Sequence, residues 1–271
     1  MKTTIQTIAR LIAAATLGGA FLLGTQGCSV KEDRRPCPCY INLAFPDRAE
    51  DDTKPVGVLG WSGGELFRET IIPSEHQPYW VKTVRKGMVT LSAWEGADNA
   101  RVTGQYVLIP PGFQCDSLYS WHQDVDATGE SVYADARLIK QFCRVTVDLK
   151  RNEQVMRDFS FLAEGNTCGY DLLSFDAMPG IYRYEPKHVE GESTVSFLIP
   201  RQLDESLALS VWFEGDFIAT YPLGMYIARM GYDWKAEELG DITVVIDLIL
   251  GYINIEVAGW EEGAVYQFIE Q

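Results

Sequence analysis

Three histidines are the side chains in this 271-residue chain best suited to acid–base catalysis. His76, His122 and His188 lie far apart, each beside a Glu, Trp or Lys. Catalytic partners meet in space, so this separation does not exclude a Ser-His-Asp or Cys-His site. No histidine, however, accompanies a nucleophile in a recognisable catalytic motif. We therefore predict a protein that is not an enzyme and needs no cofactor.

A calcium site is the second chemistry to consider, because acids alternate from Asp124 onward. Asp124, Asp126, Gly129 and Asp135 occupy the first, third, sixth and twelfth places of a calcium-loop spacing, which can wrap a hard cation. Thr128 replaces the third acid, however, and Asp135 stands where a bidentate Glu is usual. We predict a polar loop between two domains and no metal site.

The cysteines suggest disulfide chemistry more than metal binding. Cys37-Pro38-Cys39 is too tightly spaced for a zinc half-site, and no second pair completes one. An oxidising compartment permits disulfides, so a bond from Cys37 or Cys39 to Cys115 would staple the start of the chain to the first domain. Cys143 alternates with apolar residues and is predicted to be a core thiol. The full set is Cys28, Cys37, Cys39, Cys115, Cys143 and Cys168.

Cys28 is the cysteine whose context predicts a specific modification. Lys2 and Arg10 precede an apolar run from residue 11 to 23, the order of a secretory signal peptide. The run is shorter than the roughly 20 residues that a membrane-spanning helix needs. Thr25-Gln26-Gly27-Cys28 resembles a bacterial lipobox, in which the cysteine is acylated and becomes the first residue of the mature protein.

The predicted anchor decides where the rest of the chain would work. Residues 1–27 would form a lipoprotein signal peptide and residues 28–36 a tether, with palmitate among the acyl chains on Cys28. Two or more acyl chains hold a protein on a membrane stably. Lys31-Glu32-Asp33 resembles a tag that routes lipoproteins to the outer face of the outer membrane. The alternative is ordinary cleavage after Gly27, which would release a soluble secreted protein.

The charge balance excludes partners that are themselves strongly anionic. Without the leader, which holds Lys2 and Arg10, 21 basic residues face 38 acidic ones over 244 residues, a net charge of −17. Such a surface repels nucleic acid, and no basic run offsets it. We expect no nucleic-acid partner, and a chain of this length is sufficient for one large or two modest domains.

The elements expected in the first half are short strands. Cys39, Ile41, Leu43 and Phe45 alternate with other residues, and a period of two predicts a half-buried strand. Ser62-Gly63-Gly64 supplies the turn of a hairpin. Further strands are predicted at 56–61, 65–67, 79–84, 88–94 and 105–109.

A second series of strands begins near residue 138. Residues 142–149 alternate cleanly, and 159–162 should pair with them ahead of a turn at 165–169. Regular short strands between turns predict an all-β fold of two sandwiches, which we place at 37–137 and 138–271. Further strands are predicted at 181–184, 194–199, 208–213, 217–221, 241–250 and 253–257, with a short helix within 225–239.

Several short motifs follow one another in an order that can be compared with known families. They are Cys28-Ser29, Arg35-Pro36-Cys37-Pro38-Cys39, Thr90-Leu91-Ser92-Ala93-Trp94, Gly169-Tyr170-Asp171-Leu172, Gly231-Tyr232-Asp233-Trp234 and the run from Asp241 to Asp247. Their order resembles the anchor-subunit family of type V (fimbrillin) pili of Gram-negative bacteria. The resemblance implies two transthyretin-like β-sandwich domains in tandem on a lipid anchor in the cell outer membrane. It also implies attachment of the fimbrial shaft to the cell and a limit on its length.

The family resemblance also implies a mode of assembly. Shaft subunits of the superfamily lose an N-terminal strand to an Arg- or Lys-specific protease, and a neighbour donates a strand to the exposed groove. Here Pro36 follows Arg35 and hinders cleavage at that bond, although the bond between Arg34 and Arg35 stays open to attack. We predict that the first strand, residues 40–45, stays in place.

The C-terminal segment 251–271 is the predicted contact with fimbrial shaft subunits. Ile253, Ile255 and Val257 alternate with other residues, and Phe268 follows near the end. An extended tail of this kind could add to the edge of another sheet. The alternative is that these residues form the last strands of the second sandwich.

Seven tryptophans favour a different function, glycan binding by a surface-anchored adhesin. Sugar rings stack on exposed indoles, whereas aromatic rings within alternating strands usually fill a core. Only Trp80 and Trp121 have loop-like neighbours and are predicted to be exposed. Glycan binding is therefore the alternative to pilus anchoring.

Overall fold

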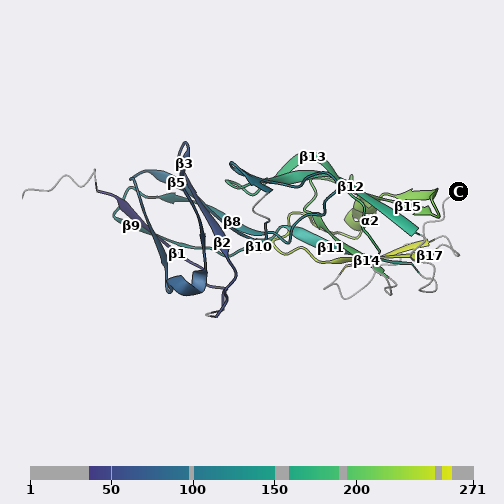
Figure 1. Cartoon of the computed structure of the whole chain (residues 1–271), viewed down its shortest axis with the longest axis horizontal. Coiled ribbons are helices and arrows are strands. Elements are labelled where there is room, and N and C mark those ends of the chain that lie inside the picture. The colour runs from purple at the N-terminus through teal and green to yellow at the C-terminus, as the bar shows by residue number, and fades with distance from the viewer. Residues whose placement is uncertain are drawn as a thin grey trace, which may run out of the picture. The chain divides into compact units, whose positions relative to one another are not determined.

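A computed structural model describes residues 37–49, 51–97, 101–149, 159–188, 194–247 and 252–257. Strands make up nearly all of the regular secondary structure in these ranges (Figure 1), which confirms the predicted all-β sandwich fold. They also contain a 3-10 turn, η1 (Pro73–His76), and a helix, α2 (Leu223–Arg229), which begins just ahead of the predicted helical segment. Within the same ranges, no helix has the length and apolar character needed to cross a bilayer.

Two sheets pack together in the first half of the chain. Their facing side chains form one buried cluster, which includes Leu43, Val58 and Leu91. β4 (Trp80–Val84), β1 (Cys39–Ala44) and β9 (Ser131–Asp135) form the smaller sheet in that order. β10 (Ile139–Lys140), β8 (Tyr119–Asp126), β5 (Met88–Glu95), β2 (Val56–Trp61) and β3 (Glu65–Ile71) form the larger one.

β1 is the central strand of the smaller sheet. It pairs antiparallel with β4 on one side and parallel with β9 on the other. Cys39, Ile41 and Leu43 are fully buried, as the period of two predicts. Both edges of β1 are therefore hydrogen-bonded, and its apolar face belongs to the core.

Two further sheets form the second half and enclose a larger cluster that includes Val145, Phe161 and Phe197. β14 (Thr194–Pro200), β11 (Phe142–Leu149), β17 (Ile242–Asp247) and β18 (Tyr252–Val257) form one sheet. β16 (Asp216–Tyr221), β15 (Ala208–Phe213), β12 (Phe159–Asp171), β7 (Tyr106–Leu108) and β6 (Val102–Thr103) form the other, and β13 (Ala177–Tyr184) also pairs with β12.

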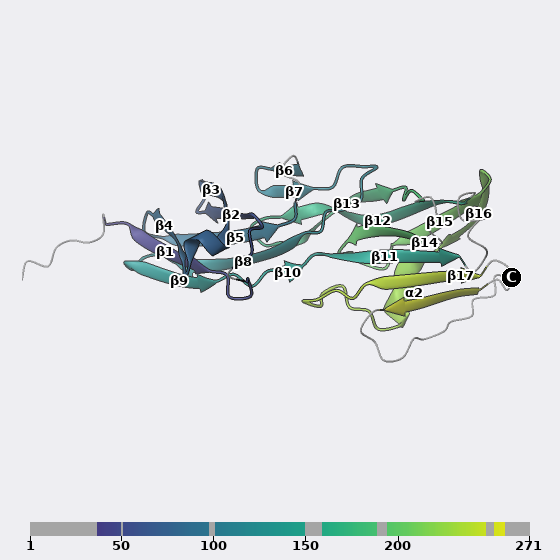
Figure 2. The same ribbon diagram turned by 60° about the horizontal axis from the view of Figure 1, so that its bottom comes forward.

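Strands from each half join a sheet of the other. β7 follows β5 in the chain but pairs antiparallel with β12 of the second half (Figure 2), and β10 pairs with β8 of the first. The described residues from Pro38 onward accordingly form one compact unit. The division between residues 137 and 138 stays a prediction.

The turn predicted at 165–169 is wrong, because β12 continues through it. Two register shifts against β13 occur between Gly165 and Gly169. Gly169 lies opposite Leu108 of β7, and a Cβ at Gly169 would overlap the carbonyl oxygen of Val107. Gly169 therefore allows two backbones to approach closely, which is the other common use of glycine in a strand.

The polar loop predicted from Asp124 to Asp135 is also wrong. Asp124 and Asp126 lie on β8, and Asp135 lies on β9, which belongs to a different sheet. The Thr90 hydroxyl donates to Asp124 Oδ1 at 2.6 Å. Hydrogen bonds from the Thr128 hydroxyl and backbone N–H lower the pKa of Asp126. The acidic run is thus the polar face of two strands.

All five cysteines in the described residues are free thiols. Cys39 lies in the core cluster of the first half and Cys115 in that of the second, so the structure gives no support to a bond from Cys37 or Cys39 to Cys115. Cys143 is fully buried, which confirms the predicted core thiol, and this burial raises its pKa to about 12. Cys37 is exposed and Cys168 is half-buried.

We expect the thiols to react in two groups. In native protein carrying Cys28→Ser, maleimide should label Cys37 and Cys168, while the three buried thiols should react only in denaturant because they are inaccessible and protonated. Mass spectrometry of peptides measures each site. Failure of Cys37 and Cys115 to react even in denaturant, until a reductant is added, would instead demonstrate a disulfide.

Gly169→Ala should lower the free energy of unfolding by about 1–3 kcal/mol, because the added Cβ forces β7 away from β12. Gly64→Ala is the matched control, since nothing lies within 4 Å of a Cβ at that position. Urea unfolding followed by circular dichroism measures both variants. Equal unfolding midpoints for the two variants would contradict the close approach.

Candidate functional site

Part of the predicted functional set lies outside the described residues. Cys28, the tag Lys31-Glu32-Asp33 and Phe268 belong to ranges for which no structure is described. Lipid attachment at Cys28 and partner binding by Phe268 therefore stay predictions.

The other predicted partner-binding residues lie on an edge strand. Ile253, Ile255 and Val257 belong to β18, which pairs antiparallel with β17 and places Ile255 opposite Val244. This is the arrangement of a last strand in the second sandwich, the alternative weighed from the sequence. Among the described strands, none pairs with the other edge of β18. Such an edge offers unpaired backbone N–H and C=O groups to an added strand.

The two basic residues between β1 and β2 are both protected from a trypsin-like protease. Arg48 has only 12% of its side chain exposed, and it forms ion pairs with Asp52 at 2.7 Å and with Glu95. Lys54 is 69% exposed, but Pro55 follows it, and proline hinders cleavage of the preceding bond. A protease that removes β1 must cut in this segment, because a cut before β1 leaves the strand attached.

The position of β1 shows that the Arg35-Pro36 junction is not the reason why the first strand stays in place. Pro36 precedes β1 in the chain, so cleavage after Arg35 would separate the tether from the strand without removing the strand. The protecting groups that the sequence pattern did not reveal are the carboxylates of Asp52 and Glu95 around Arg48. The protection of Lys54, by contrast, could have been predicted from the sequence, because Pro55 follows it directly.

The two tryptophans predicted to be exposed, Trp80 and Trp121, differ in their burial. Trp80 is only 5% exposed, and its ring packs on Phe67 with a centroid distance of 5.6 Å, so that prediction is wrong. β4 turns Trp80 toward the core of the first half. Trp121 is half-buried on β8 and lines a cavity.

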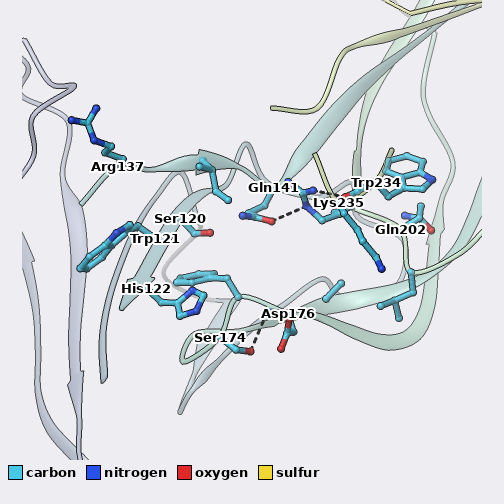
Figure 3. A pocket seen from close by; sticks show the side chains of 15 residues that line it. Ser120, Trp121, His122, Arg137, Gln141, Ser174, Asp176, Gln202, Trp234 and Lys235 are labelled. Atoms are coloured by element: carbon cyan, nitrogen blue, oxygen red, sulfur yellow. Dashed lines mark hydrogen bonds between the residues drawn. The ribbon is translucent and has the colours of Figure 1, made fainter. Parts of the chain in front are cut away.

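The cavity beside Trp121, hereafter the Trp121 cavity, has a volume of about 430 Å³. Figure 3 shows that β8 supplies Ser120, Trp121 and His122 to one side, while Gln141 and Lys235 come from later parts of the chain. Small-molecule sites occupy roughly 300–1,000 Å³ and are mainly apolar with a few convergent polar groups. The Trp121 cavity has these properties.

Arg201 fixes one wall of the Trp121 cavity. Its guanidinium donates to Gln141 Oε1 at 3.0 Å, to the Lys140 carbonyl at 2.8 Å, to the Ala236 carbonyl at 2.7 Å and to the carbonyl of Trp234. Burial lowers the pKa of Arg201, and these acceptors compensate for the water lost. Segments far apart in the sequence are joined at this one side chain.

Phe175 reaches the same cavity from a strained turn. Its φ of 52° lies in the left-handed region that non-glycine residues rarely adopt. Its backbone N–H donates to the Asp171 carbonyl at 2.6 Å, and the backbone N–H of Leu173 donates to Asp171 Oδ1 at 2.9 Å. The Phe175 ring lies 6.3 Å from that of His122. Strain of this kind concentrates at functional sites.

The described residues hold no group of three or more His, Cys, Asp or Glu side chains placed to bind a metal. The expectation that no nucleophile lies in a catalytic motif is wrong at the level of the pattern, because Gly60 to Gly64 matches G-x-S-x-G. It forms the β2–β3 hairpin, in which the Ser62 backbone N–H donates to the Gly64 carbonyl at 2.9 Å. A nucleophile elbow needs a strand-to-helix turn, so Ser62 lacks that setting.

No protein-family model matches the chain, and no curated protein matches it either. Solved structures do share its fold. A Bacteroides thetaiotaomicron protein provisionally named as polysaccharide-binding is similar with a TM-score of 0.64 and 14% identity, over 86% of this chain and 99% of that one. A Bacteroides ovatus protein provisionally named an adhesin has a TM-score of 0.59 and 15% identity, over 89% and 98%.

The fimbrial anchor protein Mfa2 from Porphyromonas gingivalis is similar with a TM-score of 0.58 and 16% identity, over 86% of this chain and 100% of Mfa2. At such identities the likeness concerns the fold. The chain therefore has the fold of a fimbrial anchor protein and of proteins provisionally named for adhesion and polysaccharide binding.

Proposed function

We propose that this chain is a non-enzymatic lipoprotein of the cell outer membrane that anchors a fimbrial (type V pilus) shaft and limits its length. The observation that carries the proposal is the two-sided pairing of β1 in the smaller sheet of the first half. The leader and Cys28 supply the anchor, and fimbrial shaft subunits are the partners.

A retained β1 distinguishes an anchor from a shaft unit. Shaft subunits of the resembled superfamily accept a donated strand in the groove that opens when they lose a strand of their own. Here β1 occupies the central position of the smaller sheet, and its side chains Cys39, Ile41 and Leu43 are fully buried. Full burial of one aliphatic side chain contributes about 1.5–3 kcal/mol to stability. The ion pairs of Arg48 and the proline after Lys54 protect the connection to β2. The chain can therefore end a polymer without continuing it through this sheet.

The edge of β18 is the surface we assign to the shaft. Ile253, Ile255 and Val257 lie on this outermost strand, and Phe268 follows in the sequence. Backbone hydrogen bonds along an open edge supply affinity, and alternate side chains supply the register. The fold shared with the fimbrial anchor protein Mfa2 supports this role.

A second candidate function is carbohydrate binding by a surface adhesin. The observation that favours it is the Trp121 cavity, where a half-buried indole and the Phe175 ring line a space of about 430 Å³. Aromatic faces in such a space can stack on a sugar ring. This activity is compatible with anchoring, because β18 and the cavity are made of different residues.

Cys28→Ser should release the protein from the outer membrane and remove filaments from the cell, because the acyl chains are the proposed attachment. Immunoblotting of membrane and medium fractions measures the first effect, and electron microscopy measures the second. Cys168→Ser, which removes a thiol of β12 that is not in the leader sequence, is the control and should behave as wild type. Cells that keep both the protein and their filaments with Cys28→Ser would refute the lipid anchor.

Disrupting the protection of Arg48 and Lys54 should make β1 removable. With trypsin, the wild-type protein should keep β1 joined to β2, whereas Glu95→Gln combined with Pro55→Ala should be cut between these strands at a rate raised at least about tenfold. Mass spectrometry identifies the cut bond. Asp47→Asn is the control, because Asp47 pairs with Arg137 instead. A surface-extracted wild-type protein that begins well beyond Phe45 would overturn retention of the strand.

A further inference from the structure

Ser120 presents an unsatisfied hydroxyl to the Trp121 cavity. Its residue is fully buried, yet its Oγ has no hydrogen-bond partner among the residues that the structure describes. Figure 3 shows this hydroxyl directed into the space between Trp121, His122 and Gln141. A buried hydroxyl without a partner is unfavourable, so a polar ligand group that enters the cavity and bonds to Ser120 would be stabilised.

Gln141 supplies a second oriented group. The residue is 2% exposed, and its Oε1 accepts from Arg201 Nε at 3.0 Å. This bond turns the amide nitrogen away from Arg201 and toward Ser120 (Figure 3). Because Arg201 is itself fixed by backbone carbonyls, the Gln141 amide is a preorganised donor.

The charge of the cavity is opposite to that of the chain as a whole. Arg137, Arg201 and Lys235 line it together with one carboxylate, Asp176. Arg137 pairs with Asp47 at 2.9 Å, and Arg201 is engaged by acceptors of the protein. Lys235 forms no ion pair with any described residue, and Figure 3 shows it on the opposite side of the cavity from Trp121. One cation is thus available to an anionic ligand.

We propose that the Trp121 cavity binds a sugar ring that carries a carboxylate, such as a uronic acid unit of an acidic polysaccharide. Its carboxylate pairs with Lys235, a neighbouring ring of the same saccharide stacks on Trp121 on the opposite side of the cavity, and sugar oxygens between them accept from Ser120 Oγ and Gln141 Nε2. Asp176 can accept a hydrogen bond from a ring hydroxyl. This inference rests on the second candidate function and goes beyond it by naming the site and the class of sugar.

Titration of purified mature protein carrying Cys28→Ser tests the proposal. The probes are a trimer of galacturonic acid and its neutral match, a trimer of galactose, followed by calorimetry and tryptophan fluorescence. The acidic trimer should bind at least about tenfold more tightly than the neutral one, because only it offers a carboxylate to Lys235. Lys235→Met should remove this preference, and Trp121→Ala should weaken binding about tenfold or more.

Ser120→Ala provides the sharpest variant because the Ser120 hydroxyl has no partner to lose within the described part of the chain. It should weaken binding of the acidic trimer about tenfold while leaving the melting temperature unchanged or higher. Ser92→Ala is the matched control: Ser92 is also fully buried, and its hydroxyl has no hydrogen-bond partner in the described ranges, but it does not line the cavity. The affinity of the Ser92→Ala variant for the acidic trimer should equal that of the parent protein.

Each other outcome contradicts the proposal in a distinct way. No binding of either trimer by the folded protein would overturn both the site and the carbohydrate function for this cavity. Equal or tighter binding of the neutral trimer would overturn the assignment to acidic sugars while keeping carbohydrate binding. Equal losses in Ser120→Ala and Ser92→Ala would show that Ser120 does not contact the ligand. The anchoring role is tested separately in cells through Cys28, so it does not depend on these results.

Discussion

Backbone pairing between strands from the two halves is the interaction on which the rest of this structure depends. Buried N–H and C=O groups must be hydrogen-bonded, and here β7 satisfies part of β12 while β10 satisfies part of β8. Arg201 adds a side-chain link by donating to carbonyls of three separate residues. The Trp121 cavity is lined by residues of the paired strands β8 and β10 and by Arg201, so its walls come from distant parts of the chain and not from one local segment.

The sheets differ in whether the edges of their strands are hydrogen-bonded to a neighbouring strand. β1 is paired on both sides and buries its apolar face, whereas β18 pairs only with β17 among the described strands. Such an arrangement suits a terminal subunit, since one sheet is already filled and another can accept a strand. The carboxylates of Asp52 and Glu95 contribute to this difference by holding Arg48 away from solvent.

Local charge and overall charge have separate consequences. A net charge of −15 for the full chain disfavours anionic partners over most of the surface. Within about one Debye length, roughly 8–10 Å, the nearest charges dominate, and those lining the Trp121 cavity are mainly cationic. The net charge of the whole sequence therefore indicates which classes of partner the protein repels, while the few charged side chains that line the cavity determine which ligand charge it can bind.

The sequence by itself determined the all-β fold, the inward face of β1 and the buried Cys143. These follow from the alternation of side chains along one strand, which is a local property. Only the tertiary structure decided that β12 continues past Gly169, that Trp80 is buried while Trp121 lines a cavity, and that Ser120 and Gln141 converge there. Those outcomes depend on which distant strand or side chain becomes the neighbour, and no periodicity in the chain encodes that choice.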